Sequence, residues 1–338
     1  MVMIRLLMAA MLGLGAAGGA WAAELKLLHA SYLSTRGLYE ELNRAFAADH
    51  FARTGQAVQV EMSHAASDHQ VAYISDGSLE ADVVSLPNSA DIDEIVGRSG
   101  KIVREWRMQH ANQSSPFATA IALLVRAGNP LGIRDWDDII ARSAQMIASD
   151  PQTSSFARYR YFVTYVHAFM QCQAEQQCIM AYLADLDRRI TVMAPTVAES
   201  KATFYTGLGD VLPVWESEAM TFLDAGGSSD YELVYPDVNV LCQPRIAAVS
   251  GNTVRHGTEA AVKAYINFVY SEAGQEIIAR HGLRPYRPSV WKRHRERFRR
   301  LNLTDMSQHG NIAEFRRSHF EPGGLYHEHV RLREPHGD

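Results

Sequence analysis

The segment from Ala194 to Met220 constrains the fold more than any other, because it predicts a helix, a buried strand and a second helix in direct succession. Apolar residues at helical spacing predict the first helix over 197–206, and two glycines then end it. The apolar run 210–214 predicts the strand, and Trp215 stands where that strand ends. Open α/β sheets hold their ligands at the ends of strands, so this junction is a candidate ligand site.

Trp215 has two possible roles at that junction. Its indole N–H is a donor that accepts no hydrogen bond, so it would suit a ligand that only accepts, such as an ionised oxyanion. A large aromatic side chain at the end of a strand also serves simply to anchor a hydrophobic core. The residues of this segment leave both interpretations open.

The length and composition favour a protein with two hydrophobic cores over one with a single large core. A chain of 338 residues with 47% hydrophobic residues can bury two cores, and its net charge of -5 gives no support to nucleic-acid binding. The basic run KRHRERFRR at 292–300 is predicted to be a solvated helix face. The sequence has no G-x-S-x-G elbow, P-loop or zinc-protease signature, so we expect no enzymatic activity.

The N-terminus has the pattern of an export signal. A short positive segment, 1–5, precedes the apolar run 6–17, and Ala20-Trp21-Ala22 offers a cleavage site between small residues. The apolar run is too short for a membrane span, and no later segment is long enough. We therefore predict a signal peptide over 1–22 and a soluble mature protein in the periplasm.

The three cysteines fit an exported protein. Cys172 and Cys178 are separated by a short polar segment and are predicted to form a local disulfide between two helices. Cys242 lies in an apolar context and is predicted to be a buried free thiol.

Two pairs of histidines are candidate metal ligands. His64 and His69 lie close together, but only Asp68 stands near them as a further ligand, so we expect no metal. His327 and His329 lie in a polar C-terminal segment and are predicted to belong to an exposed tail.

The order of predicted elements indicates two α/β lobes. A strand, a helix and a strand over 25–60 form a βαβ unit, and the apolar run 81–86 predicts a strand covered on both faces. The long apolar segments 114–128 and 245–250 are predicted to cross between the lobes. The first lobe is therefore assigned to 23–114 and 251–338, and the second to 115–250.

Six segments carry a resemblance to a known family. They are SYLSTRGLY at 31–39, SHAASDHQ at 63–70, ADVVSL at 81–86, LVRAGNPLGIRDWDDII at 124–140, GDVLPVWESEA at 209–219 and FEPGGLY at 320–326. Together they resemble motifs of the periplasmic sulfate- and thiosulfate-binding proteins of ABC importers, across nearly the whole mature sequence. The resemblance implies a type II periplasmic-binding-protein clamp, an α/β fold with two interlobe crossing segments and a ligand cleft between its lobes. It also implies a monomer without cofactors that delivers a small anion to membrane ABC permease subunits.

The resemblance also implies how the anion is held. In that family the donors are uncharged: backbone N–H groups at helix N-termini, a serine hydroxyl and a tryptophan indole. Burying a dianion is costly unless its oxygens are saturated with hydrogen bonds, and helix N-termini supply unpaired N–H groups with partial positive charge. Transferred to this sequence, the ligand-binding residues are Leu33, Ser34, Ser67, Ser154, Ser155, Phe156, Val197 and Trp215.

This sequence departs from the family pattern at the site. Leu33 replaces an aspartate, Ser155 and Phe156 replace glycines, Val197 replaces an alanine, Ala198 replaces an arginine, and Asp68 replaces a glycine. Asp68 is a possible selectivity residue, because a carboxylate repels an oxyanion unless the ligand donates a hydrogen bond. The alternative is a solvent-facing turn residue that caps the next helix. Phe156 can anchor its own helix or line the cleft.

These departures keep two functions open. The first is capture of sulfate, thiosulfate or a related oxyanion for an ABC importer. The second is a secreted binder of a small organic or phosphorylated acid on the same fold, with a role in adhesion or sensing.

Overall fold

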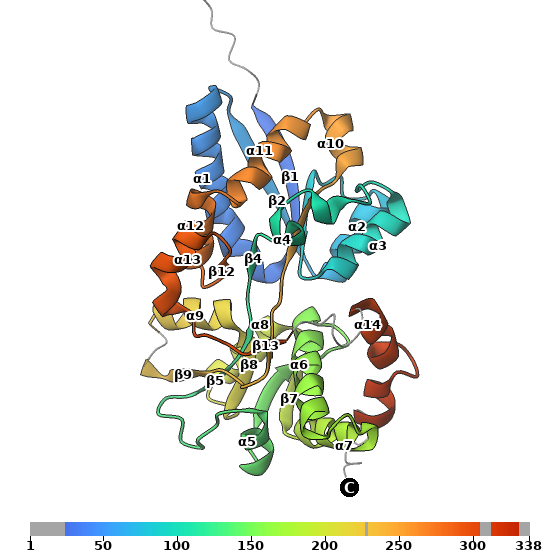
Figure 1. Cartoon of the computed structure of the whole chain (residues 1–338), viewed down its shortest axis with the longest axis vertical. Coiled ribbons are helices and arrows are strands. Elements are labelled where there is room, and N and C mark those ends of the chain that lie inside the picture. The colour runs from blue at the N-terminus through green and yellow to red at the C-terminus, as the bar shows by residue number, and fades with distance from the viewer. Residues whose placement is uncertain (1–23, 227–228, 305–311, 331–338) are drawn as a thin grey trace, which may run out of the picture.

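Two separate β-sheets form the centres of two lobes, which stack along the long axis of the molecule (Figure 1). The computed structural model describes residues 24–226, 229–304 and 312–330. The predicted signal peptide, 1–22, lies outside these residues. No helix among the described residues is long and apolar enough to span a membrane.

The first lobe is built on a four-stranded sheet with the order β11-β3-β1-β2. Its strands are β1 (Leu25–Tyr32), β2 (Val58–Ala65), β3 (Val83–Leu86) and β11 (Arg245–Ala248). β1 is parallel to β2 and β3, while β11 is antiparallel to β3. The helix α1 (Arg36–Thr54) connects β1 to β2, which confirms the predicted βαβ unit.

Helices cover both faces of this sheet, as the unbroken apolar β3 predicted. One face packs against α1, α11 (Glu259–Val269) and α12 (Glu272–Arg280), with Phe46 and Tyr265 fully buried between them. The other face packs against α2 (Ser67–Asp76) and α3 (Ser89–Ser99).

The second lobe is built on a five-stranded sheet with the order β7-β6-β8-β5-β9. Its strands are β5 (Ile121–Arg126), β6 (Met146–Ser149), β7 (Ile190–Ala194), β8 (Val211–Trp215) and β9 (Tyr231–Val234). One face carries α5 (Trp136–Ala141), α6 (Ser155–Gln171) and α7 (Gln176–Asp187). The other carries α8 (Val197–Tyr205) and α9 (Glu216–Asp224).

The helix–strand–helix succession predicted from 194–220 is present as α8, β8 and α9. Gly209 makes the tight entry into β8 possible. Its φ is +70°, and a Cβ there would lie 2.6 Å from the Ile147 side chain. Only glycine combines that backbone conformation with so close an approach.

The two segments that connect the lobes lie side by side, as the antiparallel bridge between Thr119 and Cys242 shows. The first lies within the predicted crossing at 114–128, whose later part, 121–126, is β5 of the second sheet. The second precedes Arg245, so the predicted crossing at 245–250 is misplaced: 245–248 is β11 of the first sheet, and α10 (Ser250–His256) follows. A strand covered on both faces has the same unbroken apolar pattern as a crossing segment, which explains the error.

The C-terminal part of the chain returns to the second lobe, although the sequence placed 251–338 with the first. α14 (Ile312–Phe320) and the π-helix η5 (Tyr326–Val330) pack beside α6 and α7 (Figure 1). The rings of Phe315 and Phe162 meet edge to face, with 4.7 Å between their centroids. This docking depends on aromatic contacts between segments about 150 positions apart, which no local pattern reveals.

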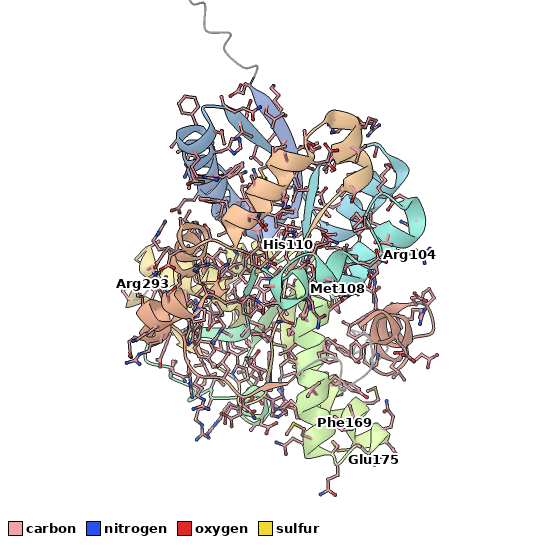
Figure 2. The ribbon with its side chains drawn as sticks, turned by 45° about the horizontal axis from the view of Figure 1, so that its top comes forward. Arg104, Met108, His110, Phe169, Glu175 and Arg293 are labelled. Atoms are coloured by element: carbon pink, nitrogen blue, oxygen red, sulfur yellow. A yellow bond between two sulfur atoms is a disulfide. The ribbon has the colours of Figure 1, made fainter. Side chains whose placement is uncertain are left out.

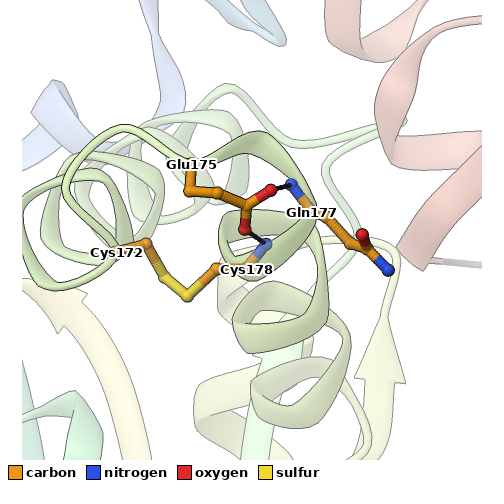
Figure 3. The surroundings of a disulfide bond; sticks show 4 residues. All are labelled: Cys172, Glu175, Gln177 and Cys178. Atoms are coloured by element: carbon orange, nitrogen blue, oxygen red, sulfur yellow. Dashed lines mark hydrogen bonds between the residues drawn. A yellow bond between two sulfur atoms is a disulfide. The ribbon is translucent and has the colours of Figure 1, made fainter.

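The disulfide prediction is confirmed: Cys172 and Cys178 are joined across the turn between α6 and α7 (Figure 3). Within this turn the Glu175 carboxylate accepts hydrogen bonds from the backbone N–H groups of Gln177 and Cys178. Cys242 is a buried free thiol, also as predicted.

Most of the basic run at 292–300 is exposed, as predicted, and several of its charges are paired. Arg293, at the outer edge of the molecule (Figure 2), pairs with Glu272 at 2.7 Å and also with Glu276. His294 pairs with Glu276 at 2.6 Å. The run therefore fastens α13 (Pro288–His294) to α12 through ion pairs.

Candidate functional site

A cavity of about 270 Å³ lies between the two lobes. All nine residues that the sequence nominated for ligand binding or selectivity line it: Leu33, Ser34, Ser67, Asp68, Ser154, Ser155, Phe156, Val197 and Trp215. The first four come from the 3-10 turn η1 (Leu33–Thr35) and from α2 in the first lobe. The other five come from the starts of α6 and α8 and from the end of β8 in the second lobe. The structure thus brings them together, while their contact with a ligand stays a prediction.

Three helices begin at this cavity: α2 at Ser67, α6 at Ser155 and α8 at Val197. The first N–H groups of a helix lack intrahelical acceptors, and the helix dipole adds partial positive charge there. At α8 the Thr196 hydroxyl accepts from the N–H of Glu199, which leaves the N–H groups of Val197 and Ala198 for another acceptor. Helix N-termini from both lobes therefore make one site for an anion.

Two serine hydroxyls of the cavity have unused donors. Ser154 Oγ accepts from the N–H of Ala157 and from the Ser149 hydroxyl, both at 3.3 Å, so its own O–H remains available. Ser67 is 5% exposed, and its Oγ has no hydrogen-bond partner among the described residues. Buried hydroxyls are normally paired, so an acceptor supplied by a ligand would complete both residues.

Trp215 anchors the second-lobe core and also lines the cavity, and its donation to a ligand stays a prediction. It is 4% exposed, and its ring meets Phe156 and Tyr159 edge to face, with centroid separations of 4.8 and 5.5 Å. It belongs to the second-lobe core and lines the cavity as well. Phe156 likewise does both, since it is buried in that core and faces the cavity. The bulky ring that replaces glycine thus supports Trp215.

Four charged residues line the cavity, and sequence reasoning found only Asp68. The others are Arg158, Lys201 and Glu218, and Lys201 pairs with Glu218 at 2.8 Å. Residues four apart share a face of a helix, so Arg158 follows Ser154 and Lys201 follows Val197 toward the cavity. That spacing could have revealed both cations. Arg158 brings a positive charge to a site that lacks the family's arginine at position 198.

The helix-capping interpretation of Asp68 is wrong. α2 has Ala66 at its N-cap with no side-chain cap. The Asp68 carboxylate instead lies 3.5 Å from Arg158 and 3.5 Å from Arg316. Because two guanidinium groups neutralise it, its repulsion of an anion is smaller than that of a free carboxylate.

The histidines near the site do not assemble a metal centre. Among the described residues, no group of three or more histidine, cysteine, aspartate or glutamate side chains could hold an ion. Burial and the nearby Arg36 lower the pKa of His64, which favours its neutral form.

The chain resembles a known family of proteins. The profile of the family described as bacterial extracellular solute-binding protein matches residues 27–284. The chain belongs to this family. Among its relatives, the protein named sulfate-binding protein in Escherichia coli is 33% identical, with 92% of this chain and 94% of the relative covered. The protein named thiosulfate-binding protein in Pseudomonas aeruginosa is 31% identical, with 96% and 98% covered.

Solved structures share the two-lobed α/β fold. The sulfate-binding protein SubI of Mycobacterium tuberculosis matches with a TM-score of 0.75 and 26% identity, over 86% of this chain and 97% of SubI. PEB3 with bound L-phospholactate matches with a TM-score of 0.51 and 14% identity, over 77% of this chain and 100% of PEB3. The second likeness shows the fold alone. The predicted fold class is confirmed.

Proposed function

We propose that this protein captures sulfate or thiosulfate in the interlobe cavity and delivers it to an ABC importer. The observation that carries the proposal is the meeting of three helix N-termini, from both lobes, at one cavity. The names of the relatives from Escherichia coli and Pseudomonas aeruginosa support the choice of anion.

The donors of the cavity suit a tetrahedral dianion. Backbone N–H groups at Ser67, Ser155 and Val197, the Ser154 hydroxyl and the Trp215 indole would each donate to an oxygen. Because they come from both lobes, an anion between them holds the lobes together. Donors that are already in place need little reorganisation, which favours tight binding.

The proposal also covers the location, oligomeric state and membrane partners of the protein. Residues 1–22 direct it to the periplasm, where it acts as a monomer and docks on membrane permease subunits. It binds and releases its anion without chemical change and without a cofactor, in keeping with relatives that are named as binding proteins.

Isothermal titration of the chain from residue 23 tests this function. We expect saturable 1:1 binding of sulfate or thiosulfate, with weaker binding of phosphate, molybdate and small carboxylic acids. Preference for a phosphorylated or carboxylated organic acid would overturn the proposal in favour of the secreted acid binder. The likeness to PEB3 carries the fold alone, so it does not favour that alternative.

A further inference from the structure

The helix α14 is held firmly by the second lobe. The Phe315 ring lies 4.7 Å from Phe162 and 5.4 Å from Tyr165 of α6, and the Phe320 ring lies 5.1 Å from Tyr161. Phe315 and Phe320 are buried. Aromatic contacts of this kind fix the position of α14 on α6, so α14 moves with the second lobe.

From this position Arg316 reaches the first lobe. Its guanidinium lies 3.5 Å from the Asp68 carboxylate on α2 and 3.9 Å from the Asp91 carboxylate on α3. Arg158 of α6 approaches Asp68 at 3.5 Å from the same lobe as α14. Two cations of the second lobe therefore face two acids of the first, directly beside the cavity.

Asp91, the acid on α3, is buried next to these cations. Asp91 is 3% exposed, and its carboxylate accepts a hydrogen bond from the Asn88 amide at 2.8 Å. Burial and the charge of Asp68 raise the pKa of Asp91 to about 7. A carboxylate in this position gains more from a nearby cation than an exposed one does, because little water competes with the cation. If the lobes moved apart, the acid and the cation would separate.

We infer that α14 is a latch, in which Arg316 holds the lobes closed over the anion by pairing with Asp68 and Asp91. Arg316 does not line the cavity, so it is a positioning residue that acts through the closure of the lobes. The use of anion release as a readout rests on the proposed function, whereas the latch itself rests on the contacts between the lobes.

A matched pair of variants on α14 provides the test. Arg316→Gln removes the latch charge, and Arg317→Gln removes the neighbouring charge, which is exposed and has no ion pair among the described residues. We expect Arg316→Gln to release radiolabelled sulfate about threefold to tenfold faster than wild type. The association rate should stay within about twofold, because the contacts form only after closure. Arg317→Gln should match the wild type, and Arg316→Lys should restore part of the loss.

A double-mutant cycle separates the latch from a general loss of structure. At pH 8, where the Asp91 carboxylate is ionised, Asp91→Asn and Arg316→Gln should each speed release. The double variant should release no faster than about the worse single variant, because the Arg316–Asp91 interaction is lost in all three. Additive effects, or equal release rates of Arg316→Gln and Arg317→Gln, would overturn the inference.

Small-angle scattering decides the question if the wild type binds neither sulfate nor thiosulfate. That result would reject the proposed function but leave the latch testable. Without ligand, Arg316→Gln should have a larger radius of gyration than Arg317→Gln, because the lobes open more often. Equal radii in that case would reject the latch as well.

Discussion

The two walls of the cleft use different parts of the chain to face the same cavity. The first-lobe wall offers backbone N–H groups, from the turn at Leu33 and the start of α2, together with the Ser67 hydroxyl and the acid Asp68. The second-lobe wall offers an indole, a hydroxyl and both cavity cations, Arg158 and Lys201, the latter paired with the acid Glu218. An anion therefore meets the indole and both cavity cations on the second lobe. Closure of the lobes brings the first-lobe acid, Asp68, beside Arg158 and Arg316 of the second lobe, which neutralise it.

This difference implies that binding energy comes unequally from the two walls. Side chains can be removed one at a time, whereas backbone donors survive substitution. Variants in the second lobe should therefore cost more affinity than matched variants in the first.

Trp215→Phe should have the largest effect. The change deletes the N–H but keeps most of the ring, and loss of a hydrogen bond to a charged acceptor costs about 1.5–3 kcal/mol, roughly ten- to a hundredfold in affinity. Because Trp215 also packs against Phe156 and Tyr159, a moderate loss of stability should accompany it. Isothermal titration and thermal unfolding measure the two effects.

Trp136→Phe is the matched control for that variant. Trp136 is fully buried in the same core, and its indole N–H has no partner among the described residues, but it does not line the cavity. The Trp136→Phe variant should be less stable than the wild type but bind the anion with the same affinity. Equal affinities of Trp215→Phe and wild type would show that the indole serves the core alone.

Arg158→Gln should weaken binding by about tenfold, since it removes a cavity cation and leaves Asp68 less neutralised beside the anion. The loss should be larger at low salt than at high salt. Arg142→Gln, an exposed arginine of the same lobe, serves as the control in the same titrations. A loss shared by both variants would point to the overall charge of the lobe.

Substitution of one serine on each wall of the cleft, Ser154 and Ser67, tests the difference between the walls directly. Ser154→Ala should lower affinity by about fivefold because a free hydroxyl donor is lost, whereas Ser67→Ala should change it by no more than about twofold if α2 offers its backbone N–H. Titration of both variants with one anion decides the matter. A larger loss at Ser67 would reverse the proposed division between the walls.

Asp91→Asn should alter the pH dependence of stability. The pKa of Asp91 is raised from 3.8 to about 7, first by burial and then by Asp68, while the facing Arg316 and Arg158 oppose the rise and Glu94 adds to it. Between these pKa values the folded state holds a proton that the unfolded state has lost, so the free energy of unfolding falls as pH rises from about 4 to 7. Asp91→Asn has no such proton to lose, so its free energy of unfolding should not show this fall. As pH rises from about 4 to 7, the variant should therefore gain stability relative to the wild type. Denaturant unfolding at pH 5 and pH 8 measures it, and parallel curves would contradict the assignment.

The sequence predicted elements well where one segment carries the whole signal. The strand ending at Trp215 and the helix after Ser154 follow from local apolar periodicity and turn residues. The candidate site residues came together because each segment keeps the motif of a known family, although no local rule would have united them.

Prediction from the sequence failed where one apolar pattern fits two structures, and where a residue's interaction partner is distant in the chain. The run at 245–248 predicts a crossing segment, but it forms an edge strand, because edge strands covered by helices are equally apolar. Arg316 was missed because its partners, Asp68 and Asp91, lie more than 200 positions away. Helical spacing alone would have located Arg158, but its pairing with Asp68 depends on how the lobes meet.

The place of β11 in the first sheet also sets an order of assembly. The strands β1, β2 and β3 lie within residues 25–86, and β11 joins them from residue 245, after every strand of the second sheet has passed in the chain. Pairing over so long a separation is slow, because the intervening chain must be confined before the contact forms. The second-lobe sheet, whose strands lie within 121–234, can therefore form while the first still lacks its last strand. Hydrogen exchange during refolding should show amides of β6 and β8 protected before those of β11, so the anion-binding cleft arises only when the chain closes back on its own beginning.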